Sequence, residues 1–208
     1  MKAFANKYTL EVGVDEAGRG PLLGRVYAGA VFWPPELELP TVRIDDSKKL
    51  RPRALEEAYH YVKENAIAYG VAYCTEEEIK SHNILHAAMT AMHRAIDQCQ
   101  LEPDLILVDG NYFDMYLNSE GEPVDHLTVK GGDATYLSIA AASILAKWER
   151  DQYIYELCKK HPELDERYSI SSNKGYGSQA HRDGIKKYGF TQFHRNFGIC
   201  KKAKFREI

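Results

Sequence analysis

The sequence contains no long hydrophobic run. A membrane-spanning helix needs roughly 18 or more consecutive apolar residues. The longest apolar stretch here, residues 136–146, is shorter than that and is flanked by charge. Residues 1–7 also lack the apolar core of a signal peptide. We therefore expect a cytoplasmic protein without membrane contact.

Cysteine is scarce as well. The sequence has four, Cys74, Cys99, Cys158 and Cys200, and no two of them form a CxxC pair. Because zinc-binding domains commonly use such pairs, we expect no zinc cluster, and we expect the thiols to be reduced and mostly buried. Internal repeats, low-complexity stretches and interdomain linkers are also absent. The 208 residues are therefore predicted to form a single domain with a sizeable core.

The chain has no overall excess of positive charge, but Lys and Arg are concentrated near the C-terminus. The net charge is −3, yet residues 171–208 contain nine Lys and Arg against two acids, a net of +7 that leaves −10 for the remaining chain. A basic segment beside an acidic body suits a protein that holds cations in one place and phosphates in another. A solvated basic tail explains the same distribution equally well. We describe the domain as a core, about residues 1–170, and a basic region, about residues 171–208.

The pattern of apolar residues predicts an α/β fold. An early strand–turn–strand unit is followed by alternating helices and strands, which is typical of a mixed sheet with helices on its faces. Strands are predicted at residues 9–15, 25–33, 66–74, 104–109 and 124–130. Helices are predicted at residues 53–65, 83–100, 133–160 and 178–187, with a short helix opened by a capping box at Thr75 and Glu78 and a polar loop over residues 168–177.

Four acids stand at the ends of these predicted elements: Asp15, Glu16, Asp109 and Asp133. Hard cations such as Mg²⁺ take several oxygen ligands, and carboxylates that converge from different strands can supply them. Ordinary structural roles are the alternative. Asp133 is well placed as the N-cap of the long helix, and Asp109, which precedes a glycine, fits turn chemistry.

The segment after the first strand carries two of these acids and a glycine-rich loop. Adjacent strand residues face opposite sides, so Asp15 and Glu16 can share a metal site only if the strand ends or bends between them. The loop that follows, Gly18, Arg19 and Gly20, allows a ligand to approach the backbone closely. Exposed N–H groups in such a loop can bind a phosphate or a sugar.

Six segments resemble bacterial ribonuclease HII, in the order in which that family has them, and they cover the chain from about residue 10 to residue 198. They are VGVDEAGRGPLLGRV (12–26), DSKKL (46–50), LVDGN (107–111), KGGDATYLSIAAASILAKWERD (130–151), NKGYG (173–177) and HRNFG (194–198). The resemblance implies a ribonuclease-H-like fold, with a mixed central β-sheet flanked by helices and a small helical C-terminal region.

The resemblance also implies roles for individual residues. Asp15, Glu16, Asp109 and Asp133 match the catalytic acids, which bind divalent Mg²⁺ or Mn²⁺. Substrate contacts are implied for Gly18, Arg19 and Gly20, which match the loop that reads the ribose 2′-hydroxyl, and for Tyr176, which matches the tyrosine at the ribonucleotide–deoxyribonucleotide junction. Lys48 and Lys49 are candidate phosphate contacts, although a solvated charge pair is an equal alternative. His181 and His194 are interpreted as core or surface histidines, because no second ligand stands at metal-binding spacing.

The implied activity is hydrolysis of the RNA strand of RNA–DNA hybrids and incision at ribonucleotides embedded in duplex DNA. Two-metal catalysis, with Asp15 bridging the ions, would cut on the 5′ side and leave 3′-hydroxyl and 5′-phosphate ends. The expected partners are these nucleic acids. A monomer without an obligate protein partner is expected, since residues 200–208 lack a glutamine-anchored aromatic motif for a sliding clamp.

Two alternatives remain. A ribonuclease HIII-like enzyme shares the fold, but it usually has an extra N-terminal domain and a different loop after the acidic pair. A non-catalytic module that binds RNA–DNA hybrids is disfavoured because all four acids are present.

Overall fold

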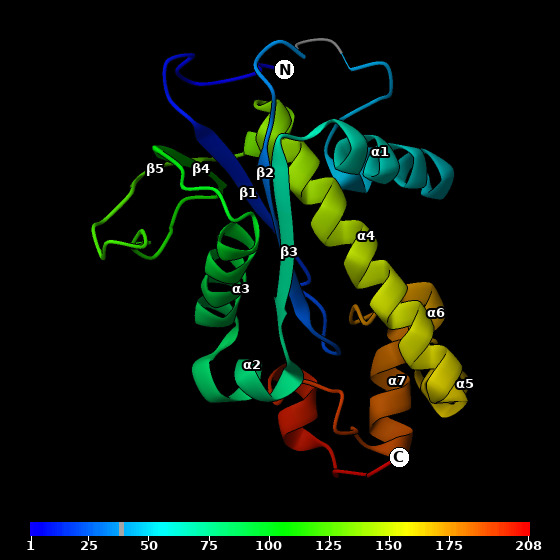
Figure 1. Cartoon of the computed structure of the whole chain (residues 1–208). Helices are drawn as coiled ribbons and strands as arrows, with labels where there is room; N and C mark the ends of the chain where they lie inside the picture. Colours follow the sequence, from blue (N-terminus) through cyan, green and yellow to red (C-terminus); the bar gives the residue numbers. More distant parts are fainter. Residues whose placement is uncertain (38–39) are drawn as a thin grey trace.

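A mixed five-stranded sheet forms the centre of the structure (Figure 1). The computed structural model describes residues 1–37 and 40–208. The strand order is β3-β2-β1-β4-β5. Antiparallel pairs join β1 to β2 and β2 to β3, whereas β1, β4 and β5 run parallel. The strands are β1 (Glu11–Ala17), β2 (Val26–Phe32), β3 (Ala68–Cys74), β4 (Leu105–Asp109) and β5 (Asp125–Val129), so the predicted mixed sheet is confirmed.

Helices cover both faces of this sheet, as predicted. One face carries α3 (Ile84–Gln98), and the other carries α4 (Leu137–Lys160) with α1 (Pro52–Asn65) beside it (Figure 1). Because strand side chains alternate in direction, β1 places Val12 and Val14 in the core under α3. None of the described helices is both long enough and apolar enough to cross a membrane.

Two glycines allow α4 to lie unusually close to the sheet. A Cβ atom on Gly13 of β1 would be 2.3 Å from the carbonyl carbon of Ser138, and one on Gly29 of β2 would be 2.4 Å from the carbonyl oxygen of Ala142. Both distances are far below van der Waals contact, so any side chain here would push the helix away. The Ala-rich first half of α4 therefore packs directly on the backbone of β1 and β2.

The long helix starts later than predicted. Asp133 lies in a short 3₁₀ helix, η2 (Gly132–Ala134), and α4 begins only at Leu137. The reason is local: Gly131 takes a left-handed conformation, with φ of 67°, and the Leu137 N–H donates to the carbonyl of Lys2. The chain therefore turns once before α4 begins.

The C-terminal residues build a small helical region at the far end of α4 (Figure 1). It contains α5 (Pro162–Tyr168), α6 (Ile170–Asn173), α7 (Gln179–Tyr188) and the 3₁₀ helix η3 (Gly198–Lys202), and it has its own apolar cluster, which includes Leu23 and Ile154. The predicted polar loop over residues 168–177 is wrong in part, because α6 lies within it. The capping box of α2 (Glu76–His82) is confirmed. All four cysteines are free, as expected, and only Cys158 is not buried.

Candidate active site

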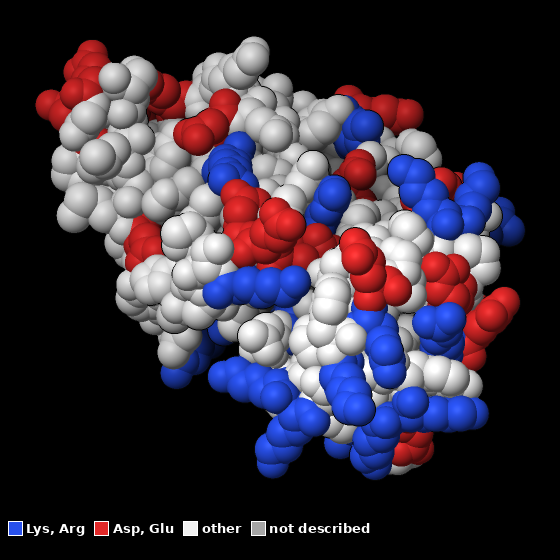
Figure 2. Space-filling view, turned by 90° about the horizontal axis from the view of Figure 1, so that it is seen from below, with Lys and Arg blue, Asp and Glu red and all other residues white. Residues whose placement is uncertain are grey.

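Three carboxylates converge at the carboxyl ends of the two central parallel strands. Val14 of β1 pairs with Val108 of β4, so the residues that follow them, Asp15 and Asp109, are neighbours. Asp133 joins them from η2. One oxygen from each of the three carboxylates lies within 4.8 Å of the other two. Figure 2 shows acidic side chains gathered in the middle of one face, with Lys and Arg side chains around and beside them.

The ordinary structural roles considered for two of these acids are wrong. The N-cap of α4 is Tyr136, and no side chain caps the helix. Asp133 is instead almost fully buried. Asp109 accepts a 2.7 Å hydrogen bond from the N–H of Gly132, which lies far along the chain and not in its own turn. This bond fixes η2, and with it Asp133, against the end of β4.

The buried carboxylates repel one another, and Lys48 offsets only part of their negative charge. Burial raises the pKa of Asp15 well above its usual range, and the charges of Glu16 and Asp109 raise it further. Burial and the neighbouring Asp109 also raise the pKa of Asp133. Lys48 faces the group: burial alone would lower its pKa, but the surrounding carboxylates, Asp15 foremost, outweigh burial and raise it. A buried set of carboxylate oxygens with an excess of negative charge fits a hard divalent cation.

Glu16 stands apart from these three acids. The strand β1 does not end after Asp15 but continues to Ala17, and alternation directs the Glu16 side chain away from that of Asp15. Its carboxylate pairs with Arg19 at 3.2 Å. Burial raises the pKa of Glu16 although Arg19 opposes this, and the charge of Asp109 contributes to the rise. Glu16 therefore lies at the border of the site.

Two buried serines support Asp15, and the sequence did not lead us to predict them. Ser143 of α4 lies close enough to Asp15 to lower the pKa of that carboxyl, and it shares a 2.9 Å hydrogen bond with Ser47 in the 3₁₀ helix η1 (Ser47–Lys49). This chain ties the DSKKL segment to the acids and places Lys48 beside them. The only sequence signal was a hydroxyl group within an otherwise apolar part of the long helix.

The glycine loop and the turn that carries Tyr176 touch each other. The N–H of Leu22 donates to the carbonyl of Gly175 at 2.8 Å, and a Cβ atom on Gly20 would lie 3.3 Å from the Tyr176 ring. Gly18 has φ of 105°, which side chains rarely allow. The Tyr176 side chain is about half exposed. The structure thus brings the predicted sugar-reading loop and the predicted junction tyrosine together on one surface.

The predicted basic contacts divide into different environments. Both lysines are exposed, but Lys49 pairs with Asp45 at 3.3 Å, whereas Lys48 lies 3.9 Å from Asp46 and is close enough to Asp15 for that charge to raise its pKa. Arg195, one of the nine basic residues of the C-terminal region, is fully buried. Arg195 therefore does not contribute to a basic surface of this region. His181 and His194 are buried core residues, as expected.

A mixed sheet with carboxylates converging beside its central parallel strands is the arrangement expected of the ribonuclease-H-like class of nucleases, and it suits metal-assisted hydrolysis. The sequence model of the family described as Ribonuclease HII matches residues 12–207. The chain is 44% identical over 192 residues to ribonuclease HII of Phocaeicola vulgatus, covering 92% of this chain and 90% of that one. It is 44% identical over 188 residues to ribonuclease HII of Neisseria meningitidis serogroup C, covering 90% and 91%. The chain belongs to the ribonuclease HII family, and it is a nuclease with ribonuclease H activity.

Solved structures agree with this assignment. Ribonuclease H2 from Pyrococcus horikoshii OT3 superposes with a TM-score of 0.74 at 26% identity, covering 92% of this chain and 95% of that one. The ribonuclease HII of Archaeoglobus fulgidus, solved in a complex with PCNA, gives 0.71 at 22% identity, covering 89% and 93%, and shows likeness of fold. The expected ribonuclease-H-like fold is confirmed. Dependence on a divalent metal, a property of the ribonuclease H family, is consistent with the three converging carboxylates.

Proposed function

We propose that this enzyme cuts the RNA strand of RNA–DNA hybrids and also incises duplex DNA on the 5′ side of single embedded ribonucleotides, leaving 3′-hydroxyl and 5′-phosphate ends. One observation carries the proposal. The carboxylate cluster includes Asp15, near the C-terminal end of β1, and the same chain segment continues into a glycine loop that touches Tyr176. Groups suited to phosphodiester hydrolysis are thereby joined to groups suited to recognise a ribose.

The acids are proposed to hold Mg²⁺ or Mn²⁺. Asp15, Asp109 and Asp133 would be the main ligands, with Glu16 completing the set and Asp15 shared between two ions. Two bound ions would supply activation of water and stabilisation of the leaving oxygen. The chain's own contribution is orientation: Ser143 lies beside the Asp15 carboxyl, and the hydrogen bond from Gly132 fixes Asp109.

Recognition of RNA is assigned to the neighbouring surface. A 2′-hydroxyl distinguishes a ribonucleotide from a deoxyribonucleotide, so the enzyme must contact this group to select its cutting site. The backbone of Gly18, Arg19 and Gly20 would make that contact. The exposed ring of Tyr176 would pack on the adjoining sugar, and Lys48, with Lys49 behind it, would approach the phosphates beside the acids.

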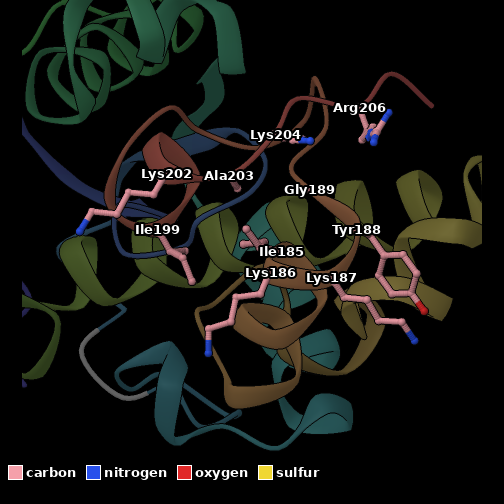
Figure 3. Close-up of a pocket in the computed structure, with 10 residues that line it drawn as sticks. All are labelled: Ile185, Lys186, Lys187, Tyr188, Gly189, Ile199, Lys202, Ala203, Lys204 and Arg206. Atoms are coloured by element: carbon pink, nitrogen blue, oxygen red, sulfur yellow. The ribbon is translucent and has the colours of Figure 1, made fainter.

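The basic region is proposed to hold the duplex backbone. Five cationic side chains line a cavity of about 620 Å³ between α7 and η3: Lys186, Lys187, Lys202, Lys204 and Arg206 (Figure 3). Several of them extend away from the ribbon in Figure 3. Phosphates attract such groups without regard to base sequence. This region would therefore add affinity for a duplex, whereas the glycine loop and Tyr176 would add selectivity.

The decisive experiment compares three duplexes of one sequence: all DNA, DNA with a single ribonucleotide, and a continuous hybrid. Each is incubated with the protein in Mg²⁺ and then in Mn²⁺, and the products are sized and tested for extension by a DNA polymerase, which requires a 3′-hydroxyl. Cleavage of both ribose-containing duplexes, with extendable ends, is expected. Cleavage of the hybrid alone would show that the enzyme does not act at single embedded ribonucleotides. Binding without cleavage in either metal would favour the non-catalytic module.

A further inference from the structure

Two consecutive buried residues of the HRNFG segment, His194 and Arg195, have no role in the site described so far. Both are fully buried, although charged and polar side chains rarely are unless their polar atoms have partners. Their hydrogen bonds lead in two directions. Arg195 reaches the glycine loop, and His194 reaches the turn that carries Tyr176.

Arg195 binds the main chain of the loop after β1. Its guanidinium donates to four carbonyl oxygens, those of Gly24 at 2.8 Å, Pro21 at 3.0 Å, Arg25 at 3.0 Å and Arg19 at 3.2 Å. A guanidinium offers five N–H donors in a rigid planar fork. Four carbonyls satisfied by one planar group leave the loop little freedom to shift.

His194 reaches Tyr176 through His181, and the partners determine where each proton lies. The backbone N–H of Thr191 can only donate, and it lies 3.0 Å from His194 Nδ1, so that nitrogen accepts. His194 therefore carries its proton on Nε2, which lies 3.0 Å from His181 Nε2. The Nε2 of His181 must therefore accept this hydrogen bond. His181 consequently carries its own proton on Nδ1 and donates to the carbonyl of Tyr176 at 2.9 Å. Both rings are neutral, in agreement with burial, which lowers the pKa of His181 and lowers that of His194 to about 3.

The Tyr176 ring depends on this main-chain anchor. Among the described residues, all hydrogen bonds of Tyr176 involve its backbone: it donates to Asn173 and accepts from Ser178 and His181. The Arg150 guanidinium lies 5.9 Å from the centre of the ring, but no hydrogen bond of the described residues holds the ring itself, so its position depends on its main chain. A displaced Tyr176 carbonyl would move the ring relative to Gly20, which it nearly touches.

We propose that His194 and Arg195, with His181 as the relay, are positioning residues that hold the glycine loop and Tyr176 in a fixed relative position, and thereby set discrimination at the ribonucleotide–deoxyribonucleotide junction. This inference rests on the proposed function. Groups that read a substrate from two separate segments must be held to a fraction of an ångström, and a shared rigid anchor provides this. The anchor here is a single dipeptide.

Two substitutions at His181 separate positioning from general support. In His181→Asn the amide nitrogen can stand near the position of Nδ1 and keep the donor to Tyr176. In His181→Gln the amide reaches the position of Nε2 instead, and that donor is lost. We expect His181→Gln to lower kcat/KM on the single-ribonucleotide duplex about tenfold more than on the continuous hybrid, the upper range for one hydrogen bond. His181→Asn keeps the donor to Tyr176 but lacks the acceptor for His194, so it should restore only part of this selectivity. His60→Gln, an exposed change on α1, should match the unaltered enzyme.

A double-mutant cycle with Tyr176→Ala tests the path of the effect. If the relay acts through the tyrosine ring, His181→Gln should not change selectivity further once the ring is gone. Equal losses on both substrates, or an undiminished effect in the Tyr176→Ala background, would overturn the inference while leaving the proposed function intact.

A spectroscopic measurement on the unaltered protein does not depend on activity or on how the variants fold. The ¹⁵N chemical shifts of the imidazole nitrogens should show His181 protonated on Nδ1 and His194 protonated on Nε2 at neutral pH. Any other pair of tautomers would refute the relay. If the unaltered enzyme failed to cut the single-ribonucleotide duplex, the proposed function would fail, and these spectra would still decide whether the relay exists.

Discussion

Replacing Asp109 with asparagine removes one charge from the carboxylate cluster with little change in shape. The oxygens of the three acids lie within 4.8 Å of one another, and two unit charges at that separation repel by about 3.5 kcal/mol at an effective dielectric constant of about 20. The raised pKa of Asp15 means that partial protonation already relieves part of this repulsion. We therefore expect metal-free Asp109→Asn to be more stable by about 1–3 kcal/mol, or about 2–10 °C in Tm.

Thermal unfolding in EDTA and in Mg²⁺ measures this effect. An ion that binds only the folded protein should raise the Tm of the unaltered enzyme, and this rise should be much smaller for Asp109→Asn. The same substitution should abolish most cleavage, and Asp133→Asn should behave alike. Glu64→Gln, an exposed change on α1, is the control and should alter neither Tm nor cleavage. An unchanged metal-free Tm for Asp109→Asn would contradict the argument from repulsion, and cleavage at the normal rate would remove Asp109 from the site.

Three further outcomes are expected. Changing Lys201, Lys202 and Lys204 together to glutamine should weaken binding to every duplex and flatten the dependence of log affinity on log salt concentration. An unchanged slope would show that these lysines are solvated and do not contact the duplex. Tyr176→Ala should reduce cleavage at a single ribonucleotide more than cleavage of a hybrid, by a factor corresponding to a stacking contribution of about 1–3 kcal/mol. The rise in Tm with Mg²⁺ should persist in this variant. Equal losses on the two substrates would show that the ring supports cleavage in general. Finally, His194 has a folded-state pKa of about 3, below the value of about 6.5 for the unfolded chain, so its contribution to stability is present above pH 6.5 and is lost as pH falls toward 3. The loss should amount to at most about 1.4 kcal/mol per pH unit, and acid titration of His194→Gln by circular dichroism should show a shallower decline.

The fold could be predicted in outline because its elements have strong local signals. The strands are apolar runs bounded by glycine, proline or charge, and α1 and α2 begin at a proline and at a capping box that are visible in the sequence. The convergence of Asp15 and Asp109 also follows from local pattern, since each follows an apolar run that forms a strand, and the two strands are parallel neighbours. Motif resemblance supplied the rest of the candidate site.

The parts that could not be predicted depend on contacts between distant segments. The late start of α4 results from Gly131 and from a hydrogen bond to Lys2. The hydrogen bond between Ser47 and Ser143 joins residues that are 96 positions apart in the sequence, and only the serine within an apolar part of the long helix indicated it. Arg195 was counted with the basic C-terminal residues because composition does not show which charged side chains are buried. Tertiary packing decides each of these cases, and no window of neighbouring residues contains it.

The close approach of α4 to the sheet has a consequence for how this protein tolerates change. In a scan of every single substitution, Gly13 and Gly29 should be as intolerant as the catalytic acids, although neither has any polar side-chain atom to offer a substrate or an ion. A methyl group at either position would lift α4 from the strands, and Ser143 and Asp133, one on the helix and one just before it, would move with it. Intolerance at these two positions would therefore result from the short distance between the helix and the sheet. Without the structure, the same intolerance would wrongly suggest that the two glycines belong to the active site.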